Sequence, residues 1–271
     1  MKNKIAFVLG NNVSTSLSPI IFNYWFVKHS VSASYGYKEI KEEEFSKKIK
    51  KILTIKDVCG LNITIPFKEK IIPYLDDLDE PSQKIGAVNC VTIKNKKFYG
   101  SNTDWIGFSE TLKEQIKKNK IIKKEAIIIG YGGTAKAILY ALLKLKYKKI
   151  HIFNRSLDKM KNINNKAVET HRLTLIKNFI NNSNLIINTT PINPLKDLKI
   201  SKKLSPNTII SDVVYKPPET KFLKYFKNQK IKTNGLSMLV NQASPCFKKW
   251  FGTKPIIDHD LFKAIRKNIN S

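Results

Sequence analysis

Apolar and polar positions alternate along the chain in blocks that predict strands and helices in turn. Short apolar runs at 4–10, 58–65 and 125–129 have the composition of buried strands. Between them, the stretch 42–53 carries apolar residues at helical spacing, namely Phe45, Ile49, Ile52 and Leu53. An alternation of this kind predicts an α/β protein whose parallel sheets are covered by helices.

The first hundred residues predict one α/β unit. After the strand at 4–10, Pro19 is suited to open a helix through 20–29, and Ser18 is its candidate N-cap. A second strand is expected at 34–40, and 90–99 forms a further strand pair or turn. The apolar strand 58–65 stops at Pro66.

The rest of the chain predicts a second α/β unit. A connecting helix at 104–118 leads into it, and its further elements are expected at 134–145, 148–153, 157–163, 185–188 and 208–213. Two closing helices are expected, one from Leu236 and one over 260–268. We therefore predict a first domain at 1–103, completed by helices within 237–271 that return to it, and a Rossmann-type doubly wound parallel-sheet domain at 104–236.

A glycine-rich turn lies at the first strand–helix corner of the second domain. Gly130 allows a sharp turn, Gly132 lets the backbone approach a pyrophosphate, and Ala135 allows close packing of helix and strand. The helix N-terminus offers N–H groups and partial positive charge to phosphates. The pattern predicts a dinucleotide site, although an ordinary loop between strand and helix is an alternative.

The strand at 148–153 ends in Asn154, Arg155 and Ser156, about 20 residues beyond the glycine turn. An NAD site would place an acidic residue there to hold the ribose 2′-hydroxyl. A cation at this point suits a 2′-phosphate instead, so the sequence favours NADP. The alternative is an ordinary exposed arginine.

Polar residues lie at or past the carboxyl end of the strand at 58–65, where a ligand is expected. Alternation puts Asn62 and Thr64 on one face, and Lys68 comes after a short turn. An ammonium close to a carbonyl oxygen can supply a proton as a hydride arrives. Taken singly, Lys68 is one of many lysines.

Composition limits the alternatives. The three cysteines lack metal-ligand spacing, no metal site is expected, and no apolar run is long enough for a signal peptide or a membrane span, so a cytoplasmic protein is expected. The net charge of +28 could indicate a nucleic-acid-binding protein. The lysines are scattered along the whole chain, however, and we expect no nucleic acid and no membrane as partner, but a small molecule bound by a monomer or homodimer.

Short segments along nearly the whole chain resemble the shikimate dehydrogenase family. They are Ser16–Pro19, Asn62–Lys68, Gly86–Asn89, Asn102–Asp104 with Gly107, Gly130–Gly133, Asn154–Ser156, Asn188–Pro191, Asp212 with Tyr215 and Pro217, and Gly235–Leu239 with Gln242 and Ala243. Each segment is weak alone, whereas their joint order and spacing are specific.

The resemblance implies NADPH-dependent, reversible reduction of 3-dehydroshikimate to shikimate, with Lys68 and Asp104 as the catalytic pair. Without the resemblance, Asp104 is equally plausible as the N-cap of the helix at 104–118. The substrate-binding residues implied are Ser16, Ser18, Asn62, Thr64, Asn89, Tyr215 and Gln242. The cofactor-binding residues implied are Gly130, Tyr131, Gly132, Gly133, Thr134, Asn154, Arg155, Ser156, Lys159, Thr190, Val213, Gly235 and Met238. A quinate/shikimate dehydrogenase using NAD is the alternative within the family.

Overall fold

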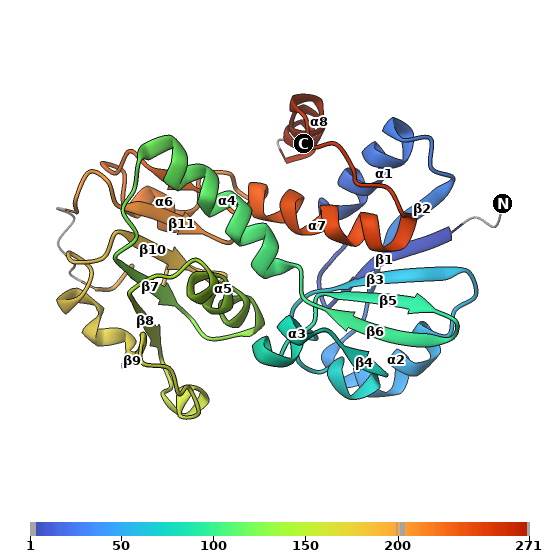
Figure 1. The fold of residues 1–271 in the computed structure, drawn as a ribbon, viewed down its shortest axis with the longest axis horizontal. Coiled ribbons are helices and arrows are strands. Elements are labelled where there is room, and N and C mark those ends of the chain that lie inside the picture. Colours follow the sequence, from blue (N-terminus) through green and yellow to red (C-terminus); the bar gives the residue numbers. More distant parts are fainter. Residues whose placement is uncertain (1–3, 199, 201–203, 270–271) are drawn as a thin grey trace. The chain divides into compact units, whose positions relative to one another are not determined.

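The computed structural model describes residues 4–198, 200 and 204–269. The chain divides into two compact units, which are described separately (Figure 1). Unit 1 comprises Met1–Gly107 and Leu239–Ser271, and unit 2 comprises Phe108–Met238. The predicted α/β class is confirmed, because each unit is built on a six-stranded sheet with helices against it.

The sheet of unit 1 brings several strand ends to one edge. β1, β2 and β3 run parallel, whereas β5 is antiparallel to both β3 and β6. The carboxyl ends of β1, β3 and β6 therefore lie at the same edge as the amino end of β5. In sheet order the strands are β2 (Ala33–Glu39), β1 (Lys4–Gly10), β3 (Val58–Ile63), β5 (Cys90–Lys94), β6 (Lys97–Ser101) and β4 (Asp77–Leu78).

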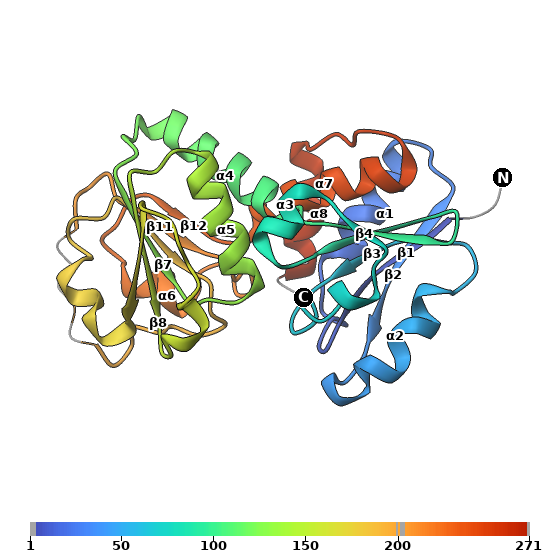
Figure 2. The same cartoon turned by 60° about the horizontal axis from the view of Figure 1, so that its bottom comes forward.

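One face of this sheet is covered by α2 (Phe45–Leu53), which follows the 3-10 turn η1 (Glu42–Glu44). Phe45 and Ile49 of α2 are buried in one cluster with apolar residues of β1 and β3. Figure 2 shows α2 on the opposite side of the sheet from α1 (Ser18–Lys28) and α8 (His259–Ile269). The shorter elements η2 (Ile72–Tyr74) and α3 (Glu80–Ile85) complete the unit.

The second face carries an aromatic cluster formed by α1 and the returning helix α7 (Leu236–Phe251). The ring of Phe22 stacks on Tyr35 at 4.0 Å between centroids and lies 5.6 Å from Trp250. A Cβ atom on Gly60 of β3 would lie 2.1 Å from Trp250 Cε2. Gly60 thus leaves the space that lets Trp250 lie against the strand, and the predicted return of the C-terminal helices to the first unit is observed.

Asp258 fixes the last helix to α1. Its Oδ1 accepts a hydrogen bond from Leu261 N at 2.9 Å in the first turn of α8, and from the Tyr24 hydroxyl at 2.8 Å. Lys28 Nζ lies 3.5 Å from Oδ2. The hydrogen bond from the Leu261 N–H is the largest influence that lowers the pKa of Asp258. Burial, together with the hydrogen bond from the Tyr24 hydroxyl to Asp258, raises the pKa of Tyr24 to about 12.

We expect Asp258→Ala to lower the free energy of unfolding of unit 1 by about 1–2 kcal/mol, because a helix loses its cap. Asp258→Asn, which keeps a capping oxygen, should lose less. Because the pKa is lower in the folded state, the ionic contribution is complete above the unfolded pKa of about 4 and is lost as the pH falls through the folded value. Denaturant unfolding at pH 7 and pH 3 checks this, and equal losses for both variants at pH 7 would contradict the capping role.

Unit 2 has an all-parallel sheet, as a doubly wound fold requires. β7 lies between β8 and β10, so the chain winds away from it in both directions and creates a switch point at the carboxyl edge. The strands in order are β12 (Lys232–Thr233), β11 (Ile209–Asp212), β10 (Leu185–Asn188), β7 (Glu125–Ile129), β8 (Lys149–Asn154) and β9 (Val168–Arg172). The helices are α4 (Asp104–Asn119, which begins in unit 1), α5 (Gly133–Lys144), α6 (Lys221–Tyr225) and the 3-10 helix η4 (Leu173–Asn178).

Two local predictions are wrong. Ser18 is the first residue of α1 rather than its N-cap; Leu17 occupies the cap position, and Ser16 Oγ accepts the Ser18 N–H at 3.2 Å. The expected helix at 157–163 is only a 3-10 turn, η3 (Asp158–Met160). In that turn only Met160 is buried, so no apolar face stabilises a longer helix.

Within the described residues, no helix combines the length and apolar character needed to cross a lipid bilayer.

Candidate active site

Lys68 is placed by a short turn that follows β3. Thr64 O accepts the Phe67 N–H at 2.9 Å and so closes the turn. Phe67 is fully buried and stacks on Phe45 at 4.3 Å between centroids. Lys68 O accepts the Val88 N–H at 2.8 Å. The backbone on both sides of Lys68 is therefore held by the core, which directs the side chain to the edge where β3 and β6 end.

Lys68 forms an ion pair with Asp104. Nζ lies 2.6 Å from Oδ2, and the two side chains are only 11% and 8% exposed. Asp104 is in the first turn of α4, so it is not the residue before the helix, and its own N–H is bonded to Asn102 Oδ1 at 3.0 Å. The helix N-terminus stabilises the carboxylate. A short, largely buried lysine–carboxylate pair at a strand edge is suited to proton transfer.

Asn89 connects this pair to the returning helix α7. Its Nδ2 donates to Asp104 Oδ1 at 2.8 Å, to Thr103 Oγ1 at 3.0 Å and to Gln242 Oε1 at 3.1 Å. Its Oδ1 accepts the Thr103 N–H at 2.6 Å. The amide nitrogen of Asn89 has only two hydrogens, so the three acceptor oxygens share two hydrogens among them. These oxygens can therefore accept a hydrogen bond from one further donor. A ligand hydroxyl is such a donor.

Asn62 is fixed within the same network. It accepts a hydrogen bond from the Tyr35 hydroxyl at 2.8 Å and donates to Asn89 O at 3.2 Å and to Cys246 Sγ at 3.3 Å. Tyr35 is also hydrogen-bonded to Ser18, and burial raises its pKa well above the ordinary value. Sequence analysis missed Tyr35 and Cys246. Cys246 lies one helical turn after Gln242 on α7, but a cysteine on a helix does not by itself indicate a site.

The remaining predicted substrate residues of unit 1 lie on the loops after β1 and β3 and in the first turn of α1. Thr64 N donates to Leu9 O at 2.9 Å, and a Cβ atom on Gly10 would lie 2.5 Å from Thr64 Cγ2, so the loops after β1 and β3 are adjacent. Ser16 and Ser18 follow in the β1 loop and at the start of α1. Tyr215 belongs to unit 2, where it follows β11 and is half-buried.

In unit 2, the glycine turn has the backbone that the sequence predicts at its first position. Gly130 has φ = +99°, and a Cβ atom there would lie 2.6 Å from Thr189 Oγ1. Gly132 precedes α5, and a Cβ atom on it would meet no atom within 4 Å. Gly133 and Thr134 begin the helix, and the Lys136 ammonium lies over the ring of Tyr131 at 5.6 Å. The turn is closely packed at Gly130 and open at Gly132, as a pyrophosphate cradle requires.

The end of β8 presents cations. Asn154 Nδ2 donates to Ser156 O at 2.9 Å and so shapes the turn, in which Arg155, Ser156 and Lys159 are exposed. Arg172, which sequence analysis missed, is opposite Asn154 in the β8–β9 register. The sequence analysis predicts no strand at 168–172, and the register between two strands cannot be deduced from one sequence.

The other predicted cofactor residues of unit 2 follow β10 and β11. Thr190 Oγ1 donates to Asn188 Oδ1 at 2.7 Å. Val213 and Gly235 touch so closely that a Cβ atom on Gly235 would lie 2.0 Å from Val213 O. Met238 is buried in the first turn of α7. The structure thus places residues from β7, β8, β10 and β11 at the carboxyl edge of one parallel sheet.

Comparisons with known proteins agree in both units. A family model described as the shikimate dehydrogenase substrate binding domain matches residues 8–91, and one described as shikimate / quinate 5-dehydrogenase matches 111–199. The shikimate dehydrogenase (NADP(+)) of Rhizobium meliloti (strain 1021) is 34% identical over 271 residues, which is 96% of this chain and 93% of the relative.

Solved structures give the same result. A shikimate dehydrogenase from Aquifex aeolicus superposes with a TM-score of 0.84 at 33% identity, over 100% of this chain and 98% of that one. The enzyme from Thermus thermophilus, solved in complex with NADP(H) and shikimate, gives 0.79 at 26% identity, over 98% and 99% of the two chains.

Proposed function

The chain belongs to the shikimate dehydrogenase family, and we propose that it catalyses the reversible, NADPH-dependent reduction of 3-dehydroshikimate to shikimate, a step of aromatic amino acid biosynthesis. The observation that carries this proposal is the Lys68–Asp104 pair, 2.6 Å apart and largely buried, with Asn89 and Gln242 beside it. We assign substrate binding to unit 1 and cofactor binding to unit 2, and we also assign a substrate-binding role to Tyr215.

Lys68 acts as the proton donor in the direction of reduction. When a hydride adds to the ketone carbon, the C=O π pair moves to oxygen, and that oxygen takes a proton from the Lys68 ammonium. Asp104 holds the ammonium in place and accepts a hydrogen bond from a neighbouring substrate hydroxyl. In the direction of oxidation, neutral Lys68 accepts the hydroxyl proton.

The other unit 1 residues recognise the rest of the substrate. Asn62, Thr64, Asn89 and Gln242 offer amide and hydroxyl groups to the ring hydroxyls, because each buried hydroxyl without a partner costs about 1–3 kcal/mol. Ser16 and Ser18 hold the substrate carboxylate through their hydroxyl protons. The shared hydrogens of Asn89 support this assignment, since acceptors on Asp104 and Gln242 keep capacity for substrate donors.

The residues of unit 2 fit NADP. Gly130–Thr134 cradle the pyrophosphate, Asn154–Ser156 with Lys159 take the ribose 2′-phosphate, and Thr190, Val213, Gly235 and Met238 line the nicotinamide. The bound cofactor supplies or receives the hydride. The open space around Gly132 and the exposed cations after β8 support this fit.

A single comparison tests the proposal. Initial rates are measured with shikimate and quinate, each with NADP⁺ and NAD⁺, and we expect shikimate with NADP⁺ to have the highest kcat/KM. A preference for quinate with NAD⁺ would support the alternative, an NAD-dependent quinate/shikimate dehydrogenase. An NAD site would need an acidic residue after β8 to hold the ribose 2′-hydroxyl. The first acidic residue there, Asp158, is exposed and paired with Lys161 at 2.6 Å.

We expect no duplex DNA binding that persists at physiological salt, which a fluorescence titration checks.

Replacement of Gly132 separates cofactor binding from folding. Gly132→Ala should raise KM for NADP⁺ about tenfold, because a methyl group keeps the pyrophosphate from the backbone. The melting temperature should change far less than in Gly130→Ala, because a Cβ atom on residue 132 meets nothing within 4 Å. Gly130→Ala is the contrasting variant, since its positive φ and the contact with Thr189 should destabilise unit 2 as well. Unchanged KM in a folded Gly132→Ala protein would argue against this cradle.

A further inference from the structure

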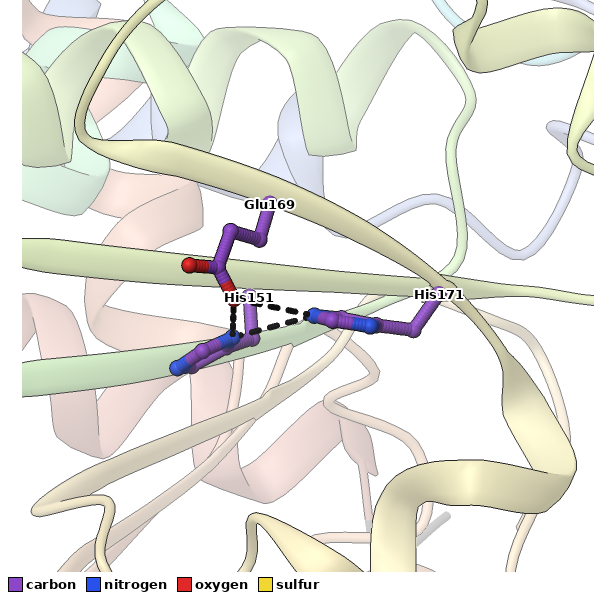
Figure 3. A group of neighbouring side chains, drawn as sticks. All are labelled: His151, Glu169 and His171. Carbon is purple, nitrogen blue, oxygen red and sulfur yellow. Dashed lines mark hydrogen bonds and ion pairs between the residues drawn. The ribbon is translucent and has the colours of Figure 1, made fainter.

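A second cluster of chemically active side chains lies in unit 2, outside the residues assigned to the reaction. His151 projects from β8, and Glu169 and His171 project from the neighbouring strand β9, the last in its sheet. The register pairs His151 with Glu169, and alternation puts Glu169 and His171 on the same face. Figure 3 shows the carboxylate and the two rings converging. We call these three residues the strand-edge cluster.

The three atoms that face one another have the spacing of metal ligands. His151 Nδ1 lies 3.1 Å from His171 Nε2 and 3.4 Å from Glu169 Oε2, and His171 Nε2 lies 3.6 Å from the same oxygen. Atoms at these separations are all about 2.0 Å from one common point, which is the bond length of zinc to imidazole nitrogen and carboxylate oxygen. We propose that the strand-edge cluster binds a Zn²⁺ ion through these three atoms.

Neighbouring side chains orient the ligands. Glu125 Oε2 lies 3.6 Å from His151 Nε2, the ring nitrogen that faces away from the cluster, so a carboxylate there favours the tautomer with Nδ1 unprotonated. Lys149 Nζ lies 3.0 Å from Glu169 Oε1 and leaves Oε2 toward the rings. Phe179 packs against both imidazoles, 4.7 Å from His151 and 4.4 Å from His171. This outer layer is of the kind that metal sites use to hold their ligands.

The surroundings also provide access to the strand-edge cluster. The side chain of His151 is 2% exposed, whereas His171 and Glu169 are 15% and 43% exposed. Water can therefore fill the fourth position from the side of β9, as in zinc sites with three protein ligands.

A bound ion would join the outermost strand to the sheet. β9 is held by β8 on one side only, and His171 directly precedes Arg172, whose backbone pairs with Asn154 at the proposed cofactor edge. Zinc would therefore stabilise unit 2 and fix the end of β9. The spacing of residues 151, 169 and 171 along the chain matches no metal-binding motif. The three side chains come together only because β8 and β9 pair in this register.

The test is a zinc titration of the tag-free, chelator-treated protein by calorimetry, with a competing chelator of known affinity. We expect one Zn²⁺ per chain and a rise in melting temperature on binding. His171→Ala should weaken binding by about a hundredfold or more, and Glu125→Gln by about ten- to a hundredfold. His259→Ala, an exposed histidine on α8 of unit 1, is the matched control and should bind as the wild type does.

The comparison between variants decides the outcome. Co²⁺ in place of Zn²⁺ should give the intense visible absorption of a four-coordinate site, absent in His171→Ala. If His171→Ala is poorly folded, Glu169→Gln replaces it, because glutamine has nearly the same shape as glutamate and removes the charged ligand from a partly exposed position on an outer strand. Lys149→Gln, which removes only the ion pair of Glu169 with Lys149, is the control for the other effect of this substitution. Equal zinc affinity of the wild type and the folded ligand variant, or no stoichiometric binding by the wild type, would overturn the proposal.

Discussion

Replacing Lys68 with alanine should lower kcat about a hundredfold or more while changing KM for shikimate far less. The reason is that the ammonium acts mainly as charge develops on the substrate oxygen, so its loss removes stabilisation of the transition state rather than of the bound substrate. Steady-state kinetics in both directions measure the effect. Circular dichroism and thermal unfolding verify that the variant is folded.

Lys70→Ala is the matched control. Lys70 lies two residues further along the same segment, is exposed, and pairs with Glu42 at 2.5 Å, so its loss should leave kcat unchanged. If Lys68→Ala retains nearly normal kcat in a folded protein, Lys68 has no part in the mechanism.

Asp104→Asn tests whether the two groups act as a unit. It should also lower kcat, because the amide cannot hold the ammonium as the carboxylate does at 2.6 Å. The Lys68→Ala/Asp104→Asn double variant should lose less than the product of the single losses, since each single change already disables the pair. Fully multiplicative losses would mean that the two residues act independently.

Much of the fold could be predicted because continuous apolar runs, clearly bounded by polar residues, mark the buried strands. Ala126–Ile129 and Lys4–Gly10 are strands where the pattern puts them, and the four apolar positions of 42–53 are buried. The predictions failed where the local signal was weak. The expected helix at 157–163 has few apolar residues. Ser18 is the expected cap of its helix, but α1 begins at Ser18, one residue before the predicted start at Pro19.

The network around the candidate site could be predicted only in part. Asn62, Lys68, Asn89 and Asp104 were recognisable from short segments that resemble a family, but the way in which Asn89 joins Asp104 to Gln242 depends on α7 returning to the first unit. Tyr35 and Cys246 carry no sequence signal of their own, because tyrosine on a strand and cysteine on a helix are ordinary core residues. Their hydrogen bonds to Asn62 follow from tertiary packing alone.

Arg155→Ala should raise KM for NADP⁺ about ten- to a hundredfold and leave KM for shikimate nearly unchanged. Loss of a charge-assisted hydrogen bond of about 1.5–3 kcal/mol to a phosphate gives a change of this size. The side chain is exposed at the end of β8, so the substitution should not disturb the fold.

The decisive comparison is with NAD⁺, which lacks the 2′-phosphate. If Arg155 binds that phosphate, KM for NAD⁺ should be the same in the wild type and in Arg155→Ala, and only the preference for NADP⁺ should fall. Arg266→Ala, an exposed arginine on α8 of unit 1, controls for the loss of one positive charge from a strongly basic chain, and should change neither constant. An equal rise of KM for both cofactors would show that Arg155 contacts a part of the cofactor that NAD⁺ and NADP⁺ share. If the wild type uses NAD⁺ as well as NADP⁺, Arg155 does not have the 2′-phosphate-binding role assigned to it.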